Sequence, residues 1–339
     1  MNSIYNLSLA DLENYFVNHQ DKKFRGQQVF DWLYRKRVDH FEEMTNLKKE
    51  VIELLKQDFT LSTIKIVKQE ADTDVKKFLF SLKDEEQIEA VLMNHNYGNS
   101  LCISTQVGCN MGCKFCESGR LKKIRNLETH EMVEQILMIE KEIGKRISHV
   151  VVMGIGEPFD NYDNLVKFIE IMNHPKGIAL GSRHITVSTC GIVPKIIQFS
   201  TLPYQVNLAI SLHAPNNDIR NQIMAINRAY PLELLIDTLK DYLKKTNRRV
   251  TFEYILLKDI NDQEKHALEL VKLVKGMNCY INLIPYNETN NISFQRSDYH
   301  TISKFYDILK KNKINATIRK EFGSKISAAC GQLRSKKED

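Results

Sequence analysis

The sequence has no long apolar run and no stretch rich in proline, glycine or serine. No hydrophobic segment reaches the length that a membrane span requires, so a membrane-embedded protein is not expected. The first residues, MNSIYNLSLADLENYF, are amphipathic and acidic, unlike a secretory signal peptide, which favours a cytoplasmic location. Because 42% of the 339 residues are hydrophobic, we expect a folded chain with a sizeable core.

Cysteine is scarce, yet three of the seven cysteines are crowded into GCNMGCKFCESG, as Cys109, Cys113 and Cys116. In a reducing compartment such a cluster usually binds a metal or does chemistry. Zinc needs a fourth ligand, and the nearest downstream histidines, His130 and His149, lack finger-like spacing. An iron–sulfur cluster also takes thiolates, normally four, so three ligands would leave one iron open to a substrate.

The net charge of +6 is a mild excess, and the basic residues gather in several patches. Such patches suit a phosphate backbone, although solvated helix faces have the same composition. The patches alone therefore do not establish nucleic-acid binding. They lie at residues 22–25, 35–37, 120–125, 244–249 and 334–337.

The hydrophobic period changes along the chain. Residues 7 to about 60 have the apolar spacing of helices, and KKFLFSL and QIEAVLMN then read as two strands joined by the polar turn KDEEQ. From about residue 100, short apolar strands alternate with amphipathic helices, which implies right-handed crossovers and a parallel sheet. Six repeats predict an α/β protein with an open, partial (β/α)6 barrel whose chemistry lies at the carboxyl ends of its strands. The expected strands are LCIST, HVVVMGI, HITVS, QVNLAISL, TFEYIL, YINLIP and NATIRKEF.

The cysteine spacing, on a loop after the first strand of a partial barrel, resembles the radical S-adenosylmethionine superfamily. The resemblance implies a 4Fe–4S cluster held by the three thiolates, with an open iron that chelates S-adenosylmethionine. The stretch VVMGIGEPFDN resembles the superfamily's GGEP-type motif, in which Gly156 and Glu157 would hold the methionine amino group. A dinucleotide-binding fingerprint fails there because its third glycine would fall at Phe159.

Longer motifs narrow the resemblance to the RlmN and Cfr family of radical adenine methyltransferases, from about residue 25 to residue 334. These motifs are LCISTQVGCNMGCKFC, GIGEPFDN, HITVSTCGIVP, AISLHAPNN, INLIPYN and ISAACGQLR. The resemblance implies two molecules of S-adenosylmethionine per turnover: one methylates Cys330, and the other yields a radical that abstracts hydrogen from that S-methyl group. The methylene radical adds to an electron-poor ring carbon of adenine. Cys102 then attacks the Cys330 sulfur, and a disulfide forms as the RNA leaves.

The same matching makes Glu89 the proton acceptor and assigns further residues to the S-adenosylmethionine pocket, all at or just past strand ends: Ser188, Ser211, Leu212, His213 and Asn287. Taken alone, Glu89 would be a surface carboxylate and His213 a core histidine. Free cysteines are usually buried and inert, and we keep that interpretation for Cys279 and Cys190.

The resemblance also sets the expected domains and partners. Residues 1–70 would form an N-terminal helical accessory domain that binds RNA, 71–94 a short connecting β-hairpin, 95–325 the radical core barrel, and 326–339 the tail that carries Cys330. The implied substrates are adenosine 2503 of 23S rRNA and adenosine 37 of tRNA. The electron donor would be flavodoxin with its reductase, and we expect a monomer.

Within the family, GEPFDN, AISLHAPN and INRAY have the forms of the RlmN branch, which methylates C2 of adenine. The alternatives are C8 methylation, as in the Cfr branch, another radical enzyme, and a non-enzymatic zinc-containing RNA-binding module. The chain departs from the family at Lys325 and Ser327, where acidic residues are usual, and at Cys190, where serine is common.

Overall fold

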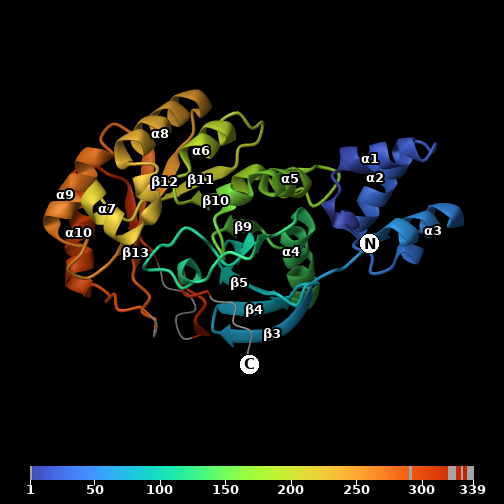
Figure 1. Cartoon of the computed structure of the whole chain (residues 1–339), viewed down its shortest axis with the longest axis horizontal. Helices are drawn as coiled ribbons and strands as arrows, with labels where there is room; N and C mark the ends of the chain where they lie inside the picture. The colour runs from blue at the N-terminus through green and yellow to red at the C-terminus, as the bar shows by residue number, and fades with distance from the viewer. Residues whose placement is uncertain (1, 290–291, 320–325, 330, 334–339) are drawn as a thin grey trace.

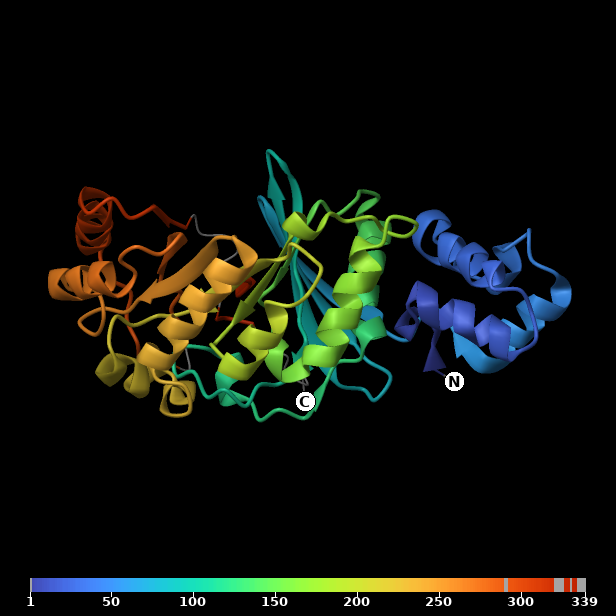
Figure 2. The same ribbon diagram turned by 90° about the horizontal axis from the view of Figure 1, so that it is seen from above.

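Figure 1 shows the computed structural model of the chain, which describes residues 2–289, 292–319, 326–329 and 331–333. The molecule is elongated, with the N-terminal helices at one end and the barrel at the other (Figures 1 and 2). Among the described residues, no helix combines the length and the apolar character needed to cross a membrane.

The N-terminal part is helical, as the sequence predicted for residues 7 to 60. Ser8 and Asp11 form a capping box at its first long helix, in which each side chain accepts a hydrogen bond from the other residue's backbone N–H. Two short parallel strands, β1 (Asn2–Ser3) and β2 (Phe59–Thr60), close this part of the chain. Its helical elements are η1 (Ile4–Asn6), α1 (Leu9–Asn18), α2 (Phe24–Asp31), η2 (Trp32–Lys36), η3 (Phe41–Glu43) and α3 (Lys49–Asp58).

A ten-stranded sheet organises the rest of the molecule, in the order β14-β13-β12-β11-β10-β9-β6-β5-β4-β3. The strands from β6 to β14 in this order are parallel, which confirms the predicted partial barrel. They are β6 (Gly98–Cys102), β9 (His149–Val152), β10 (Ile185–Thr189), β11 (Asn207–Ser211), β12 (Val250–Leu256), β13 (Cys279–Pro285) and β14 (Ala316–Ile318). Helices cross between successive strands: α4 (Thr129–Ile143), α5 (Tyr162–Asn173), α6 (Val193–Phe199), α7 (Asn217–Ile223), α8 (Leu232–Thr246), α9 (Glu264–Leu273) and α10 (Tyr299–Lys311).

The other edge of the sheet is antiparallel. The structure confirms the two predicted strands as β4 (Val75–Ser81) and β5 (Gln87–His95), and it adds an outer strand, β3 (Lys65–Asp72). β3 is polar and largely exposed, so its sequence lacks the alternation of apolar and polar residues that is typical of a half-buried strand. Because β5 also pairs with β6, this extension and the barrel share one continuous sheet.

The loops at the carboxyl ends of the parallel strands form the mouth of the barrel. The first of them, residues 108–124, runs between the short strands β7 (Gln106–Val107) and β8 (Arg125–Asn126), which pair with each other. The other short helices are η4 (Ser118–Arg120), η5 (Pro158–Asn161), η6 (Ser182–His184) and η7 (Ala225–Arg228).

Candidate active site

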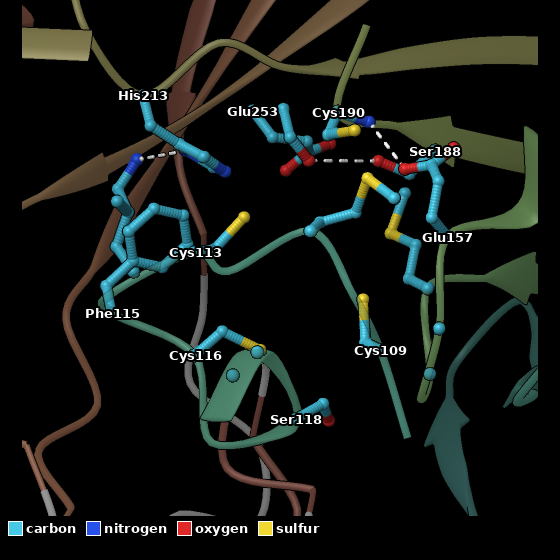
Figure 3. Close-up of a pocket in the computed structure, with 18 of the residues that line it drawn as sticks. Cys109, Cys113, Phe115, Cys116, Ser118, Glu157, Ser188, Cys190, His213 and Glu253 are labelled. Carbon is cyan, nitrogen blue, oxygen red and sulfur yellow. Dashed lines mark hydrogen bonds between the residues drawn. The ribbon is translucent and has the colours of Figure 1, made fainter. Parts of the chain in front are cut away.

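The loop of residues 108–124 presents three cysteines to one space. Gly108 allows its tight path, because the residue has a φ of +74° and a Cβ there would lie 2.3 Å from the carbonyl oxygen of Lys122. The sulfur atoms of Cys109, Cys113 and Cys116 point toward the same opening at the mouth of the barrel (Figure 3). The local backbone thus brings together residues separated by gaps of three and two positions.

A cavity of about 150 Å³ lies against these thiols and continues into the barrel. On its far side lie residues from the ends of several parallel strands, as expected for ligand binding in this type of fold. Five of the predicted pocket residues line it together with the three cysteines: Gly156, Glu157, Ser188, Ser211 and His213.

The thiols of the loop are the type of ligand that an iron–sulfur cluster takes. Burial raises the pKa of Cys109 to about 12 and that of Cys113 well above its usual range, so cluster binding would have to displace protons. Among the described residues, no group of three or more His, Cys, Asp or Glu side chains is placed to hold a metal ion. Three thiols on one loop match the ligands of a cluster in which each thiolate binds a different iron.

Glu157 is a buried carboxylate at the cavity wall. Its pKa is raised by burial, although backbone hydrogen bonds partly oppose this. Oε2 accepts from the Cys190 N–H at 2.8 Å and Oε1 from the Phe159 N–H at 3.0 Å, which fixes the plane of the carboxylate. An ammonium group beside it would favour its ionised form, as the predicted contact with the amino group of S-adenosylmethionine requires.

Polar side chains from four strands, β10 to β13, lie inside the barrel. The hydroxyl oxygens of Ser188 and Ser211 lie 3.5 Å apart. Glu253, also buried, accepts a hydrogen bond from the Asn282 Nδ2 at 2.8 Å, and burial raises its pKa. Such a row of hydroxyl and carboxyl groups suits a ligand with several hydrogen-bonding groups, which is what S-adenosylmethionine offers.

His213 takes a constrained position at the end of β11. Its φ of +56° lies in the left-handed region, and its Nδ1 accepts from the Ile255 N–H at 3.0 Å. Burial, aided by the neighbouring Arg220 charge, lowers the pKa of His213 to about 3, so the ring is neutral. The rings of His213 and of Phe115 in the cysteine loop pack edge to face, with their centroids 4.8 Å apart.

Two predicted pocket residues do not line the cavity. The Leu212 side chain is fully buried in the main core, so only its backbone can face a ligand. Asn287 is buried just past β13, and its Oδ1 finds no hydrogen-bond partner among the described residues. An unsatisfied buried acceptor is costly, so this oxygen is available to a donor that the bound ligand would bring.

Glu89 and Cys102 lie outside this cavity, on one face of the antiparallel extension. Cys102 pairs directly with Val91, and Glu89 is two residues from Val91 on the same strand, so all three share a face. Cys102 belongs to a small apolar cluster that also contains Ala328 and Leu333 of the C-terminal segment.

Cys330 and Lys325 lie outside the described residues, but the neighbours of Cys330 are placed. The carbonyl oxygen of Gly331 accepts from the Glu117 N–H at 2.8 Å, and that of Leu333 accepts from the Ser118 hydroxyl at 2.8 Å. Ala328 and Leu333 therefore lie in the apolar cluster around Cys102, while Gly331 and Leu333 bond to the cysteine loop.

The structure adds residues that sequence reasoning missed. Arg220 has no solvent exposure, and its guanidinium donates to the carbonyl oxygens of Cys190 at 2.7 Å, Leu212 at 3.2 Å and Ser211 at 3.3 Å. An isolated acid within the apolar stretch TFEYIL could have pointed to Glu253. Arg220 gave no comparable signal, because arginine on a helix normally lies on the surface.

Two family models match the chain: that of the Radical SAM superfamily over residues 103–271, and that of the ribosomal RNA large subunit methyltransferase N-terminal domain over residues 2–61. Among curated proteins, a probable dual-specificity RNA methyltransferase RlmN of Spiroplasma citri is 54% identical over 342 residues, which cover 100% of this chain and 99% of that protein. The protein of the same name from Acholeplasma laidlawii is 54% identical and covers 98% of both chains. The crystal structure of a radical SAM methyltransferase from Sphaerobacter thermophilus is 39% identical, has a TM-score of 0.94 and covers 98% of this chain and 99% of that one.

Proposed function

Because this chain belongs to the RlmN family of radical S-adenosylmethionine RNA methyltransferases, we propose that it methylates C2 of adenine in RNA. Its targets would be adenosine 2503 of 23S rRNA and adenosine 37 of tRNA. The S. citri and A. laidlawii relatives are named for dual specificity, which supports two classes of RNA substrate.

One observation carries the proposal. The described residues on either side of Cys330 join the cysteine loop to the surroundings of Cys102: Gly331 bonds to Glu117, and Ala328 packs in the apolar cluster of Cys102. A radical enzyme that acted directly on its substrate would need no C-terminal segment at this position. A cysteine that carries the methyl group between cofactor and RNA does need one.

The residues divide the reaction between them. Cys109, Cys113 and Cys116 would hold a 4Fe–4S cluster, which when bound supplies the electron that activates S-adenosylmethionine. Glu157, Ser188, Ser211 and His213 would orient S-adenosylmethionine, with the Leu212 backbone and the Asn287 side chain at its border.

Three residues would then handle the transferred carbon. Cys330 accepts a methyl group by displacement and later bonds through that carbon to C2 of the adenine. Glu89 takes the proton that leaves C2. The Cys102 thiolate attacks the Cys330 sulfur, which forms a disulfide and breaks the bond between that sulfur and the transferred carbon; the electron pair of that bond stays on the carbon, which takes a proton from solvent to become the methyl group.

The experiment is anaerobic reconstitution with iron, sulfide, S-adenosylmethionine and an rRNA fragment, followed by mass spectrometry of the nucleosides. We expect 2-methyladenosine. Detection of 8-methyladenosine would assign the C8 reaction instead. Binding of one zinc ion and no iron would rule out the proposed enzymatic function.

Two cysteine variants test the roles of the thiols. Cys330→Ala is expected to abolish methyl uptake by the protein, and Cys102→Ala to accumulate a covalent protein–RNA adduct, as mass spectrometry of the protein can show. Cys279→Ala is the matched control, because Cys279 is also buried but begins β13 at the opposite end of the barrel. Normal turnover by either active-site variant would contradict the assigned roles.

A further inference from the structure

Lys77 of β4 contacts the predicted proton acceptor directly. Its Nζ lies 3.3 Å from Oε1 of Glu89 and 2.8 Å from Oε2 of Glu70. The side chains of Lys77 and Glu89 are only 12% and 6% exposed. A pair this well shielded is held more strongly than an exposed surface ion pair, which contributes little.

The strand register places this pair on the reacting face of the sheet. Lys77 pairs across the strands with Val91, and Val91 pairs with Cys102, so the three residues form one row over β4, β5 and β6. Directly paired residues point to the same face, so Lys77 and Cys102 share it. Val75, two residues before Lys77, lies in the same apolar cluster as Cys102 and Ala328.

The pairing has a chemical consequence. A carboxylate surrounded by apolar groups tends to keep its proton, because burial disfavours the charged form. Val91, two residues from Glu89 on the same face, is apolar and belongs to the cluster around Cys102. The ammonium group of Lys77 offsets that effect and favours a carboxylate that can accept a proton.

We propose that Lys77 is a positioning residue of this enzyme: it holds the Glu89 carboxylate ionised and oriented on the Cys102 face, and Glu70 in turn fixes Lys77 from the solvent side. The inference deepens the proposed function and rests on it, since Glu89 needs this support only if it removes the proton from C2. Glu70, with a third of its side chain exposed, also contacts Lys68 at 3.5 Å.

The role assigns Lys77 to one half of the reaction. Methylation of Cys330 requires no proton acceptor at the adenine ring, whereas release of the methylated RNA does. Loss of Lys77 should therefore spare the first half and slow the second, with the protein–RNA adduct as the species that accumulates. Loss of a merely structural contact would weaken both halves together.

The test compares Lys77→Met, Lys77→Arg and Lys76→Met in the reconstituted enzyme. Lys76 is the matched control, since it is adjacent on β4 and faces the opposite side of the sheet. Methyl uptake by the protein is measured from labelled S-adenosylmethionine, and 2-methyladenosine and the protein–RNA adduct are measured in a single turnover.

For Lys77→Met we expect normal methyl uptake, 2-methyladenosine formation slowed by about tenfold to a hundredfold, and accumulation of adduct. Lys77→Arg should recover most of the rate, and Lys76→Met should match the wild type. Full-rate release by Lys77→Met, or an equal loss in both halves, would overturn the inference and leave the proposed function standing. Failure of the wild type to make 2-methyladenosine would overturn the proposed function and this inference with it.

Discussion

At the scale of single residues, the site depends on Arg220. Among the described residues, this arginine forms no hydrogen bond or ion pair with a carboxylate. Arg220 of α7 binds three carbonyl oxygens at the ends of β10 and β11, and its Nη1 also donates to the Asn227 Oδ1 at 2.9 Å. Burial lowers the pKa of Arg220 to about 10, which still leaves it charged at neutral pH. One side chain thereby ties together the strand ends that carry Ser211 and Cys190.

Replacing Arg220 with Gln should therefore damage both stability and cofactor binding. The shorter neutral side chain leaves buried carbonyl oxygens without donors, which should lower the free energy of unfolding by about 3 kcal/mol. Denaturant unfolding of the iron-free protein measures this, and calorimetry of the reconstituted protein measures affinity for S-adenosylmethionine, which should fall. Arg228→Gln, at an exposed arginine eight residues further on, serves as the control. Equal stability of the two variants would contradict this role.

The sequence revealed residues whose spacing is local and missed those whose partners are distant. Cys109, Cys113 and Cys116 could be singled out as candidate ligands because one short loop presents all three. Arg220 and Lys77 act through contacts with other strands, 30 residues away for the Cys190 carbonyl. No local pattern encodes such a contact, because it exists only once the strands are paired.

At the scale of elements, the mouth of the barrel relies on close backbone approach between loops. Gly156, after β9, has a φ of +105°, and a Cβ there would lie 2.6 Å from Cβ of Gln106 and 2.9 Å from its backbone nitrogen. Gln106 in turn accepts a hydrogen bond from the Glu157 N–H at 2.9 Å through its Oε1. The glycine thus lets β7 reach and fix the loop that carries Glu157.

Gly156→Ala should displace that loop without removing any of the three cysteines. The added methyl group meets Gln106 and the backbone is strained, so we expect a loss of about 2 kcal/mol in the free energy of unfolding and a clear loss of S-adenosylmethionine affinity. Iron and sulfide content should stay near the wild-type value. Gly144→Ala is the control, because that glycine also has a positive φ but has open space around it. Unchanged cofactor affinity in Gly156→Ala would show that the loop tolerates the shift.

The sequence predicted the elements with clear periodicity and missed the one without it. The parallel strands are short apolar runs between amphipathic helices. This pattern remains recognisable when single residues depart from it. β3 lies on an edge with Lys65 and Lys68 exposed and Glu70 partly exposed, so its pairing with β4 is set by the chain's return at residues 73–74 and not by burial. Glu70, the residue that contacts Lys77, lies on this unpredicted strand.

At the scale of the whole molecule, one carboxylate on the barrel joins the N-terminal helices to the rest. Glu134 of α4 is 1% exposed, and it accepts hydrogen bonds from the Thr63 N–H at 2.7 Å and from the Ser3 hydroxyl at 3.2 Å. Thr63 lies in the link between β2 and β3, and Ser3 ends β1. The main hydrophobic cluster also runs without a break from Phe16 of α1 into the barrel. The N-terminal part is therefore docked firmly, although it has its own small sheet.

Glu134→Ala tests whether this docking matters for RNA. The substitution leaves two backbone N–H groups, of the partly buried Thr63 and the buried Ile64, without their acceptor, which should cost about 2 to 3 kcal/mol and speed proteolysis at residues 61–64. Iron content and cleavage of S-adenosylmethionine without RNA should persist, because the cysteine loop lies at the mouth of the barrel. Affinity for the rRNA fragment, measured by fluorescence anisotropy, should fall if the N-terminal helices grip phosphates. Glu142→Gln, on an exposed position of the same helix, is the control. If Glu134→Ala is cleaved faster at residues 61–64 but keeps wild-type affinity for the RNA, the RNA contacts lie on the barrel instead.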